Sequence, residues 1–194
     1  MSIIKRDLFY TFLISLITGF VGQTLIPLLA SSFCFTHWDF SGLISNIDIY
    51  PLAIVIMICM SNQGSKHVFF RIVTYFVGLC LGYYGWTSGL DIYHSIVQNN
   101  SGYLYNILSD ILDTVGYIIL ALLAGVWGYF TIKFESNKVL FYILITPFAI
   151  VELLSAYENL TTVDVNIIMA IIDLFCLIGI FFVVRKKTKN SELS

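Results

Sequence analysis

Two carboxylates lie well inside long apolar stretches near the C-terminal end of the chain. Glu152 falls within Val139 to Ala156, and Asp173 falls within Val165 to Val184. A carboxylate in hydrocarbon is costly unless it is protonated, paired or facing a polar cavity, so such residues are functional-site candidates. They could bind a cation or an amine-bearing solute, or couple to protons. The alternative is that both are protonated or bonded to neighbouring hydroxyls and only hold helices together.

The composition indicates the kind of domain that holds these carboxylates. Of the 194 residues, 58% are hydrophobic and 11% are charged, whereas about a quarter of residues are charged in ordinary soluble proteins. No long polar stretch is present in which a second domain could lie. We therefore expect a single transmembrane domain over residues 1–194, with the lipid bilayer as its first partner and no nucleic-acid partner.

The apolar stretches predict an all-α fold, a polytopic membrane helix bundle with six transmembrane helices. The spans lie at about residues 8–30, 50–61, 68–88, 111–132, 139–156 and 165–184. The second span is short, because a dozen residues reach only about two thirds of a 30 Å hydrocarbon core. By hydropathy alone this segment could be a re-entrant piece. Asp48 is a plausible cap for it, with Pro51 in the first turn.

The distribution of basic residues decides how these segments are threaded. If all six cross and the N-terminus is cytoplasmic, every Lys and Arg falls on one side. The other side then receives Asp39, Asp48, Asp91, Asp110, Asp113, Glu158 and Asp164. A re-entrant second segment would place two basic loops outside. The positive-inside rule therefore predicts a multi-pass protein of the cell membrane with both termini and all basic loops in the cytoplasm.

This threading predicts the depth of several polar side chains. Gln23 and Glu152 lie about 15 and 13 residues from the inner starts of their helices, which is roughly 20 Å at 1.5 Å per residue. Asp173 descends from the outer side to about mid-membrane, and Tyr83 and Trp86 lie at similar or slightly shallower height. We therefore expect an outward-facing polar site in which these five residues contact a small-molecule ligand.

Two connections between spans lie on the predicted outer side. The longest one, Leu90 to Asp110, holds two short amphipathic pieces, Leu90 to Val97 and Tyr103 to Leu108, broken at Asn99 to Gly102. Their tyrosines suit helices that lie at headgroup level. The last outer loop is expected over Tyr157 to Asp164.

A metal site is a weaker candidate in these outer loops. His37 with Asp39, and Asp91 with His94, each combine an imidazole and a carboxylate. Together they could make a site of two histidines and two aspartates. The alternative is that all four are ordinary solvated residues. We expect no cofactor.

Small residues recur at helical spacing in the third and fourth spans. Intervals of four, three and four residues place glycines near one helix face, and the fourth span repeats Ala-x-x-x-Gly twice. The residues concerned are Gly78, Gly82, Gly85 and Gly89, followed by Gly125 and Gly128. Such positions let another helix backbone approach closely. They indicate packing inside the bundle or, alternatively, the face of a homodimer.

The sequence lacks three common catalytic motifs. The chain has no H-E-x-x-H for zinc hydrolysis, no G-x-S-x-G nucleophile elbow and no Walker-type glycine loop. We therefore expect a protein that is not an enzyme.

In length, helix number and placement of both termini, the chain resembles the substrate-binding subunits of energy-coupling-factor vitamin transporters. The resemblance implies binding of a small solute from outside and docking on a shared coupling protein through small residues of the first helix. Only Ser15-x-x-x-Gly19 and Thr18-x-x-x-Gly22 could serve that docking here, and the alanine-rich motif typical of the family is missing.

Two functions fit these observations. The first is a non-enzymatic solute-binding or transport subunit, with other membrane subunits as partners. The second is an accessory, immunity or assembly membrane protein that acts through helix surfaces and outer loops. They differ in the surroundings of Glu152 and Asp173. A common cavity open to the outside favours the first, and local bonds in a sealed core favour the second.

Overall fold

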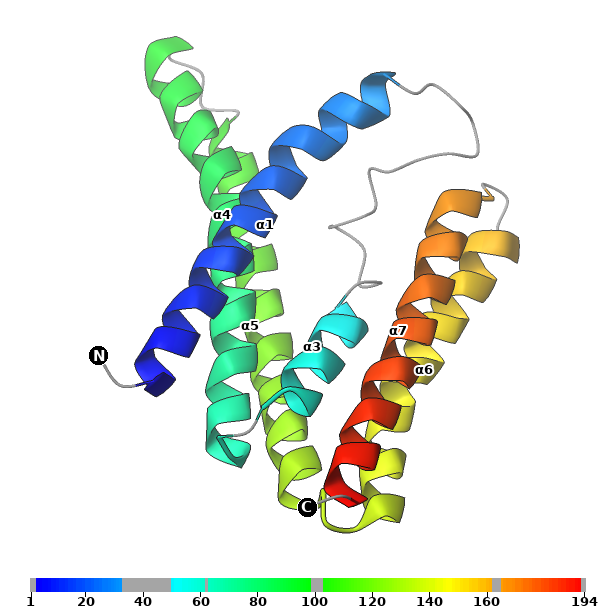
Figure 1. Cartoon of the computed structure of the whole chain (residues 1–194). Helices are drawn as coiled ribbons and strands as arrows, with labels where there is room; N and C mark the ends of the chain where they lie inside the picture. The colour runs from blue at the N-terminus through cyan, green and yellow to red at the C-terminus, as the bar shows by residue number, and fades with distance from the viewer. Residues whose placement is uncertain (1–2, 33–49, 62, 99–102, 162–164, 193–194) are drawn as a thin grey trace. The chain divides into compact units, whose positions relative to one another are not determined.

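The computed structural model describes residues 3–32, 50–61, 63–98, 103–161 and 165–192. These residues form six helices and contain no strand (Figure 1). The helices are α1 (Ile3–Ser32), α3 (Tyr50–Cys59), α4 (Ser65–Gln98), α5 (Tyr103–Lys133), α6 (Lys138–Thr161) and α7 (Ile167–Glu192). The expected all-α class and the six helices are therefore confirmed.

Within the described ranges, four helices are long and apolar enough to cross a membrane. They are Ser65–Val97 within α4, Tyr103–Lys133, Lys138–Thr161, and Ile167–Lys189 within α7. Helix α3 is apolar but has ten residues, or about 15 Å at 1.5 Å per residue. Crossing by α1 and α3, the cytoplasmic termini and the cell membrane as location stay predictions.

The chain divides into two compact units. Unit 1 comprises residues 1–25 and 69–125, and unit 2 comprises residues 26–68 and 126–194. Most of α1, α4 and α5 belong to unit 1, whereas α3, α6 and α7 belong to unit 2. The expected single transmembrane domain stays a prediction.

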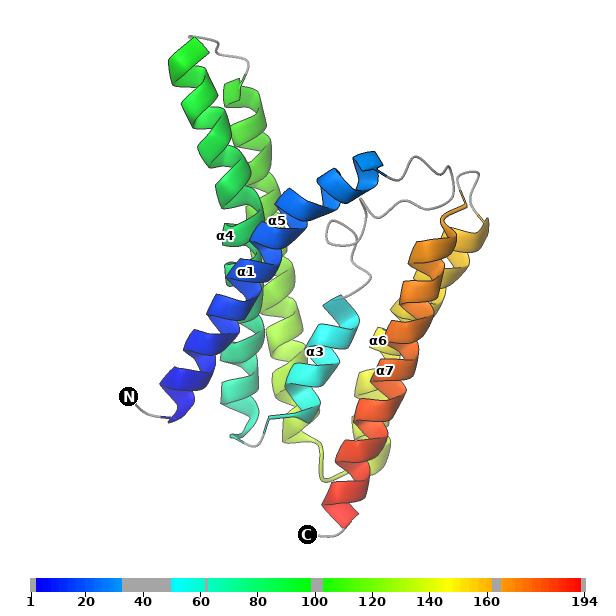
Figure 2. The same cartoon turned by 45° about the horizontal axis from the view of Figure 1, so that its top comes forward.

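In unit 1, α4 and α5 lie side by side and α1 crosses α4 (Figures 1 and 2). Ile72, Phe76 and Leu79 of α4 are buried, and so is Ala121 of α5. The spacing of four and three residues places the α4 side chains on one face of the helix. This face forms the apolar core of unit 1.

The α4–α5 hairpin differs from the expected arrangement at its far end. Residues 90–97 continue α4, and residues 103–108 begin α5. The prediction of separate short helices at headgroup level is therefore wrong. No proline interrupts either segment, and Gly89 within a helix costs only about 1 kcal/mol relative to Ala. The predicted break at residues 99–102 lies outside the described residues.

In unit 2, α6 and α7 lie side by side, with the short α3 packed against both (Figures 1 and 2). Most residues of α3 are buried, including Ile54, Val55 and Ile58. A short helix that is apolar on all sides is stable where neighbouring helices cover it. Pro51 is its second residue, where a missing N–H is tolerated. The predicted cap Asp48 lies outside the described residues.

Asparagines begin both long helices of unit 2. The Oδ1 atom of Asn137 accepts hydrogen bonds from the backbone N–H groups of Val139 (3.1 Å) and Leu140 (3.2 Å). At the start of α7, Oδ1 of Asn166 accepts one from the N–H of Met169 (3.3 Å). These bonds satisfy N–H groups that lack a partner within the helix, which fixes where α6 and α7 begin.

Candidate functional site

Glu152 and Asp173 occupy the packed seam between α6 and α7 in unit 2. Both side chains are 0% exposed. On α6 the buried positions are Phe141, Ile145, Glu152 and Ala156, and on α7 they are Met169, Ala170, Asp173, Cys176, Ile180 and Val184. On each helix the carboxylate therefore lies on the buried face, at a position where the neighbouring buried residues are mostly apolar. Their helical spacing explains this, because residues three, four or seven apart share one helix face.

A side-chain amide from α6 contacts the aspartate of α7. Nδ2 of Asn159 donates a hydrogen bond to Oδ2 of Asp173 over 2.9 Å, and lies 3.5 Å from Oγ of Ser155. Glu152, Ser155 and Asn159 follow one another at intervals of three and four residues, so they share one face of α6. The site is a polar seam with two carboxylates, one amide and one hydroxyl.

Sequence reasoning missed Asn159 because it expected an outer loop from Tyr157. Helix α6 instead continues to Thr161, and the carbonyl of Asn159 accepts the N–H of Asn166 over 2.9 Å. The expected start of the loop is therefore wrong. The spacing of Asn159 from Glu152, seven residues later, was the available signal. It returns a side chain to the same helix face after two turns.

The pairing of the two helices separates the carboxylates along the seam. Asn159 contacts Asp173, and the Tyr142 hydroxyl lies 3.4 Å from Oγ1 of Thr188. In an antiparallel pair these two contacts place Glu152 level with residues 178 to 180. That is five to seven residues beyond Asp173, or about 8–10 Å at 1.5 Å per residue. The two carboxylates therefore follow one another in depth instead of facing each other.

The other three predicted site residues belong to unit 1. Gln23 is half-buried on α1, and Tyr83 is half-buried on α4 next to Tyr84, with ring centroids 5.0 Å apart. Trp86 packs edge-to-face on Phe20 at 5.2 Å. Glu152 and Asp173 lie in unit 2. A common site of all five residues stays a prediction.

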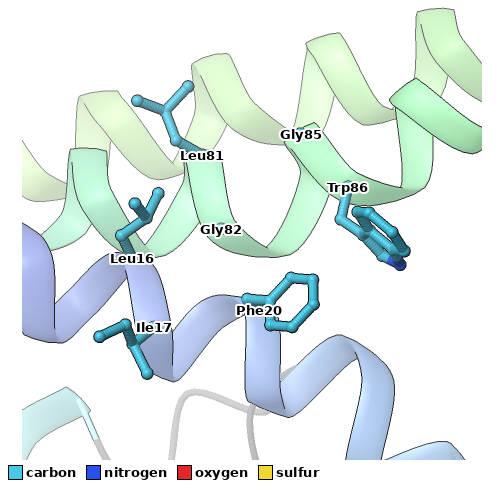
Figure 3. A pocket seen from close by; sticks show the side chains of 7 residues that line it. All are labelled: Leu16, Ile17, Phe20, Leu81, Gly82, Gly85 and Trp86. Carbon is cyan, nitrogen blue, oxygen red and sulfur yellow. The ribbon is translucent and has the colours of Figure 1, made fainter.

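Unit 1 has an open groove where α1 crosses α4. Its volume is about 380 Å³, and its lining residues are Leu16, Ile17, Phe20, Leu81, Gly82, Gly85 and Trp86 (Figure 3). No carboxylate, amide or hydroxyl side chain lines it. Trp86 and Phe20 thus line an apolar groove within unit 1. Neither Gln23 nor Tyr83 is among the lining residues.

Small residues make the α1–α4 crossing tight. A β-carbon added to Gly82 would overlap the backbone carbonyl of Leu16, and one added to Gly19 would overlap that of Leu79. At Gly78 it would overlap Oγ of Ser15, a side chain that is 0% exposed. The two helices therefore meet backbone to backbone.

This crossing occupies the residues that the family resemblance would use for docking. Ser15 and Gly19 face α4 within unit 1. Gly22 is also buried, and the Thr18 hydroxyl donates to the carbonyl of Ile14 (2.9 Å). Docking of a coupling protein stays a prediction, but α4 covers Ser15 and Gly19 within unit 1.

The remaining glycines differ in their surroundings. Gly85 and Gly89 have open space above the α-carbon, whereas a β-carbon on Gly125 would lie 2.9 Å from a ring atom of Phe69. Gly128 is buried. A homodimer through the glycines of α4 stays a prediction, but Gly78 and Gly82 have no room for a second copy.

The predicted metal ligands come together only in part. Asp91 and His94 lie one turn apart on α4, and the His94 ring stacks on Tyr103 with centroids 5.7 Å apart. His37 and Asp39 lie outside the described residues. Within the described part of the chain, no group of three His, Cys, Asp or Glu side chains could hold a metal ion.

Comparison with models of protein families, with curated proteins and with solved structures finds no match for this chain. Fold and composition define a class: a helical, apolar bundle compatible with an integral membrane protein. Within that class, the features that distinguish this chain are the polar seam of unit 2 and the glycine crossing of unit 1.

Proposed function

We propose that this chain is a non-enzymatic solute-binding or transport subunit of the membrane, with its site in the polar seam of α6 and α7. One observation carries the proposal. Two carboxylates with 0% exposure occupy core positions of two helices that are long and apolar enough to cross a membrane. Residues of this kind are expensive in such surroundings and mark ion or proton pathways.

The arrangement favours a proton or a small cation as the bound species. A buried carboxylate is stable when a proton or cation neutralises it. With the carboxylates about 8–10 Å apart in depth, one small ion does not bridge both. The species therefore binds at Asp173 and Glu152 in succession, and the amide of Asn159 orients the Asp173 carboxylate.

Asp173 lies closer than Glu152 to the α6–α7 connection. It is six residues from the first residue of α7, Ile167, or about 9 Å along the helix. The basic residues predict that this connection is outside the cell. An outward-facing entrance would then reach Asp173 first and Glu152 second.

One observation favours the alternative of an accessory, immunity or assembly protein. Both carboxylates are fully buried, and Asp173 already accepts a hydrogen bond from a neighbouring helix. Buried acids bonded in this way can simply hold helices together. In that case the helix surfaces would carry the function.

Proton flux and thermal stability distinguish the two functions. Purified protein in proteoliposomes containing a pH-sensitive dye is given a pH gradient, with and without sodium, potassium or choline. Melting temperatures are measured with the same ions. For a transport subunit, we expect wild-type flux or stabilisation by one ion, and its loss in Glu152→Gln and Asp173→Asn.

Glu158→Gln is the matched control, because Glu158 is an exposed carboxylate on the same helix. It should behave as wild type. No flux and no stabilisation by any ion, with Glu152→Gln and Asp173→Asn merely less stable, would contradict the transport proposal and favour the accessory role.

A further inference from the structure

The polar side chains of the seam continue between the two carboxylates. Ser155 lies three residues after Glu152 on α6, and Cys176 lies three residues after Asp173 on α7. The pairing of α6 with α7 places Cys176 level with residues 154 to 156. A hydroxyl and a thiol therefore occupy one level in the gap of about 8–10 Å that separates the carboxylates in depth.

Ser155 is connected to Asp173 through one amide group. Nδ2 of Asn159 lies 2.9 Å from Oδ2 of Asp173 and 3.5 Å from Oγ of Ser155. An amide NH2 group has two hydrogens, so it can donate to both oxygens. Glu152 is a neighbour of Ser155 along α6, because residues three apart lie next to each other on a helix. The hydroxyl thus has a carboxylate in either direction along the seam.

The hydroxyl is suited to carry a proton across this gap. A hydrogen bond between two oxygens spans about 2.5–3.0 Å, so a proton cannot pass from one carboxyl group to the other in a single step. A serine hydroxyl donates one hydrogen, accepts others and rotates, whereas a thiol is weak both as a donor and as an acceptor. Ser155 is therefore the better proton carrier of the two groups in the gap.

The seam differs on the two sides of Glu152. Toward Asp173 it contains the hydroxyl and the amide, which are half-buried. In the other direction, the next seam positions are Phe141 and Ile145 of α6 and Val184 of α7, which are buried and apolar. Apolar side chains carry no proton, so within the seam Glu152 is reached from the side of Asp173.

The surroundings favour a proton over a metal cation. Asn159 presents N–H donors to the oxygens of Asp173 and Ser155, and these donors would compete with a metal cation for the same oxygens. A fixed positive charge in the path would repel a proton. Residues 139–184 contain no Lys, Arg or His, so neither helix places such a charge in this part of the seam.

We propose that the seam of α6 and α7 is a proton relay, in which the Ser155 hydroxyl passes a proton from Asp173 to Glu152. The proton on the Asp173 carboxyl group moves to Oγ of Ser155 while the hydroxyl's own hydrogen moves to the Glu152 carboxylate. Asp173 is left ionised and Glu152 neutral, and rotation of the hydroxyl restores the starting arrangement. The Asn159 amide, which donates to Asp173, stabilises the ionised form. The relay rests on the function proposed above and names its bound species as the proton.

Infrared spectroscopy after a pH jump tests the relay without requiring net transport. The full-length protein is held in phosphatidylcholine nanodiscs, and the carbonyl stretch of each protonated carboxyl group is followed in time. Asp173→Asn and Glu152→Gln assign the two bands. In wild type, we expect both groups to exchange protons after the jump, and Glu152 to lose its exchange in Asp173→Asn.

Ser155→Thr and Ser155→Val form a matched pair, because threonine and valine have the same shape and differ in the hydroxyl. The valine variant should slow proton exchange at Glu152 by at least about tenfold and leave that at Asp173 within about twofold of wild type. The threonine variant should resemble wild type. Cys176→Ala is the control at the same level on α7, and it should also resemble wild type, because a thiol is a weak donor and acceptor.

Equal exchange rates at Glu152 in the threonine and valine variants would overturn the relay. If Ser155→Val does not fold, Ser155→Ala is compared with Ser155→Thr in the same way. Slower exchange at Glu152 in Cys176→Ala, with the valine variant unaffected, would assign the proton to the thiol and overturn the role of Ser155. Absence of exchange at Glu152 in wild type would also overturn the relay.

Proton flux in proteoliposomes separates the failure of the relay from the failure of the proposed function. Flux or ion stabilisation that is lost in Asp173→Asn but unchanged in Ser155→Val would overturn the relay and leave the solute-binding function standing. Flux that requires sodium or potassium would do the same. Wild-type exchange at Glu152 that depends on the Ser155 hydroxyl, without flux or stabilisation by any ion, would support the relay and contradict transport.

Discussion

The helices of unit 1 and the helices of unit 2 pack against each other in different ways within each unit. In unit 1, α1 and α4 meet at Gly19 and Gly82, where the backbone of one helix touches the backbone of the other. In unit 2, α6 and α7 meet through side chains, and Glu152 and Asp173 lie in the seam. Lipid tails are as apolar as leucine, so helices in a membrane associate through close packing or through polar contacts. The α1–α4 crossing uses close packing, and the α6–α7 seam uses polar contacts.

The glycines show the same difference on a finer scale. A β-carbon on Gly82 would meet backbone atoms, which cannot move aside. A β-carbon on Gly179 of unit 2 would meet the end of the Leu52 side chain at 3.1 Å, which can adopt another rotamer. The α1–α4 crossing of unit 1 thus requires a residue without a side chain at position 82. The packing around Gly179 in unit 2 is made by side chains such as Leu52.

The largest effect is expected at the α1–α4 crossing. Gly82→Leu forces the helices apart and should lower the free energy of unfolding by about 3 kcal/mol. Unfolding of the purified protein by SDS titration in mixed micelles measures it. Gly85→Leu, one turn away with open space above it, should change this value by less than about 0.5 kcal/mol.

Equal destabilisation by Gly82→Leu and Gly85→Leu would contradict the close backbone contact. The pair of variants also limits how a homodimer can be tested. Because Gly82 lies against α1, a substitution there disturbs the fold itself. Gly85→Leu is the variant whose oligomer size reports on dimerisation through α4.

A smaller effect is expected in the seam of unit 2. Asn159→Leu removes the amide that donates to Asp173 and should cost about 2 kcal/mol, since a fully buried carboxyl group then loses a hydrogen-bond donor. The same SDS titration measures it. In an Asp173→Asn background the penalty should shrink, because the carboxyl acceptor is gone. An unchanged penalty would show that Asn159 stabilises α6 without Asp173.

The smallest effect is expected near Pro147 of α6. Pro147 has no N–H, so the helix turn before it lacks one hydrogen bond. Nε1 of Trp127 donates to the carbonyl of Leu144 in this turn over 2.8 Å. Trp127→Phe should cost about 1 kcal/mol, measured as before.

Pro147→Ala provides the control for this last prediction. It restores the N–H at position 147, whose acceptor in the helix is the carbonyl of Ile143 and not that of Leu144, so Trp127→Phe should cost the same in that background. A smaller cost in the Pro147→Ala background would show that the indole instead satisfies the carbonyl that Pro147 leaves free.

Much of the fold could be predicted from the sequence because the signals are local. Apolar stretches specify helices, and Glu152 and Asp173 are recognisable as unusual because of the residues that flank them. The lengths of α4 and α5 were not predicted, because the apolar runs end before the helices do, whereas backbone hydrogen bonding continues past them. Because the extra turns of α5 were not predicted, the exposed apolar side chains at its N-terminal end were not predicted either.

The sequence by itself therefore determined the helical, apolar class, the six helices and the carboxylates in the last two of them. Only the tertiary structure decided that Asn159 reaches Asp173, and that Gly19 and Gly82 face each other's helices. The physical reason is that helix propensity and hydropathy act over a few neighbouring residues. A contact between helices depends on register and crossing, which residues far apart in the chain set together.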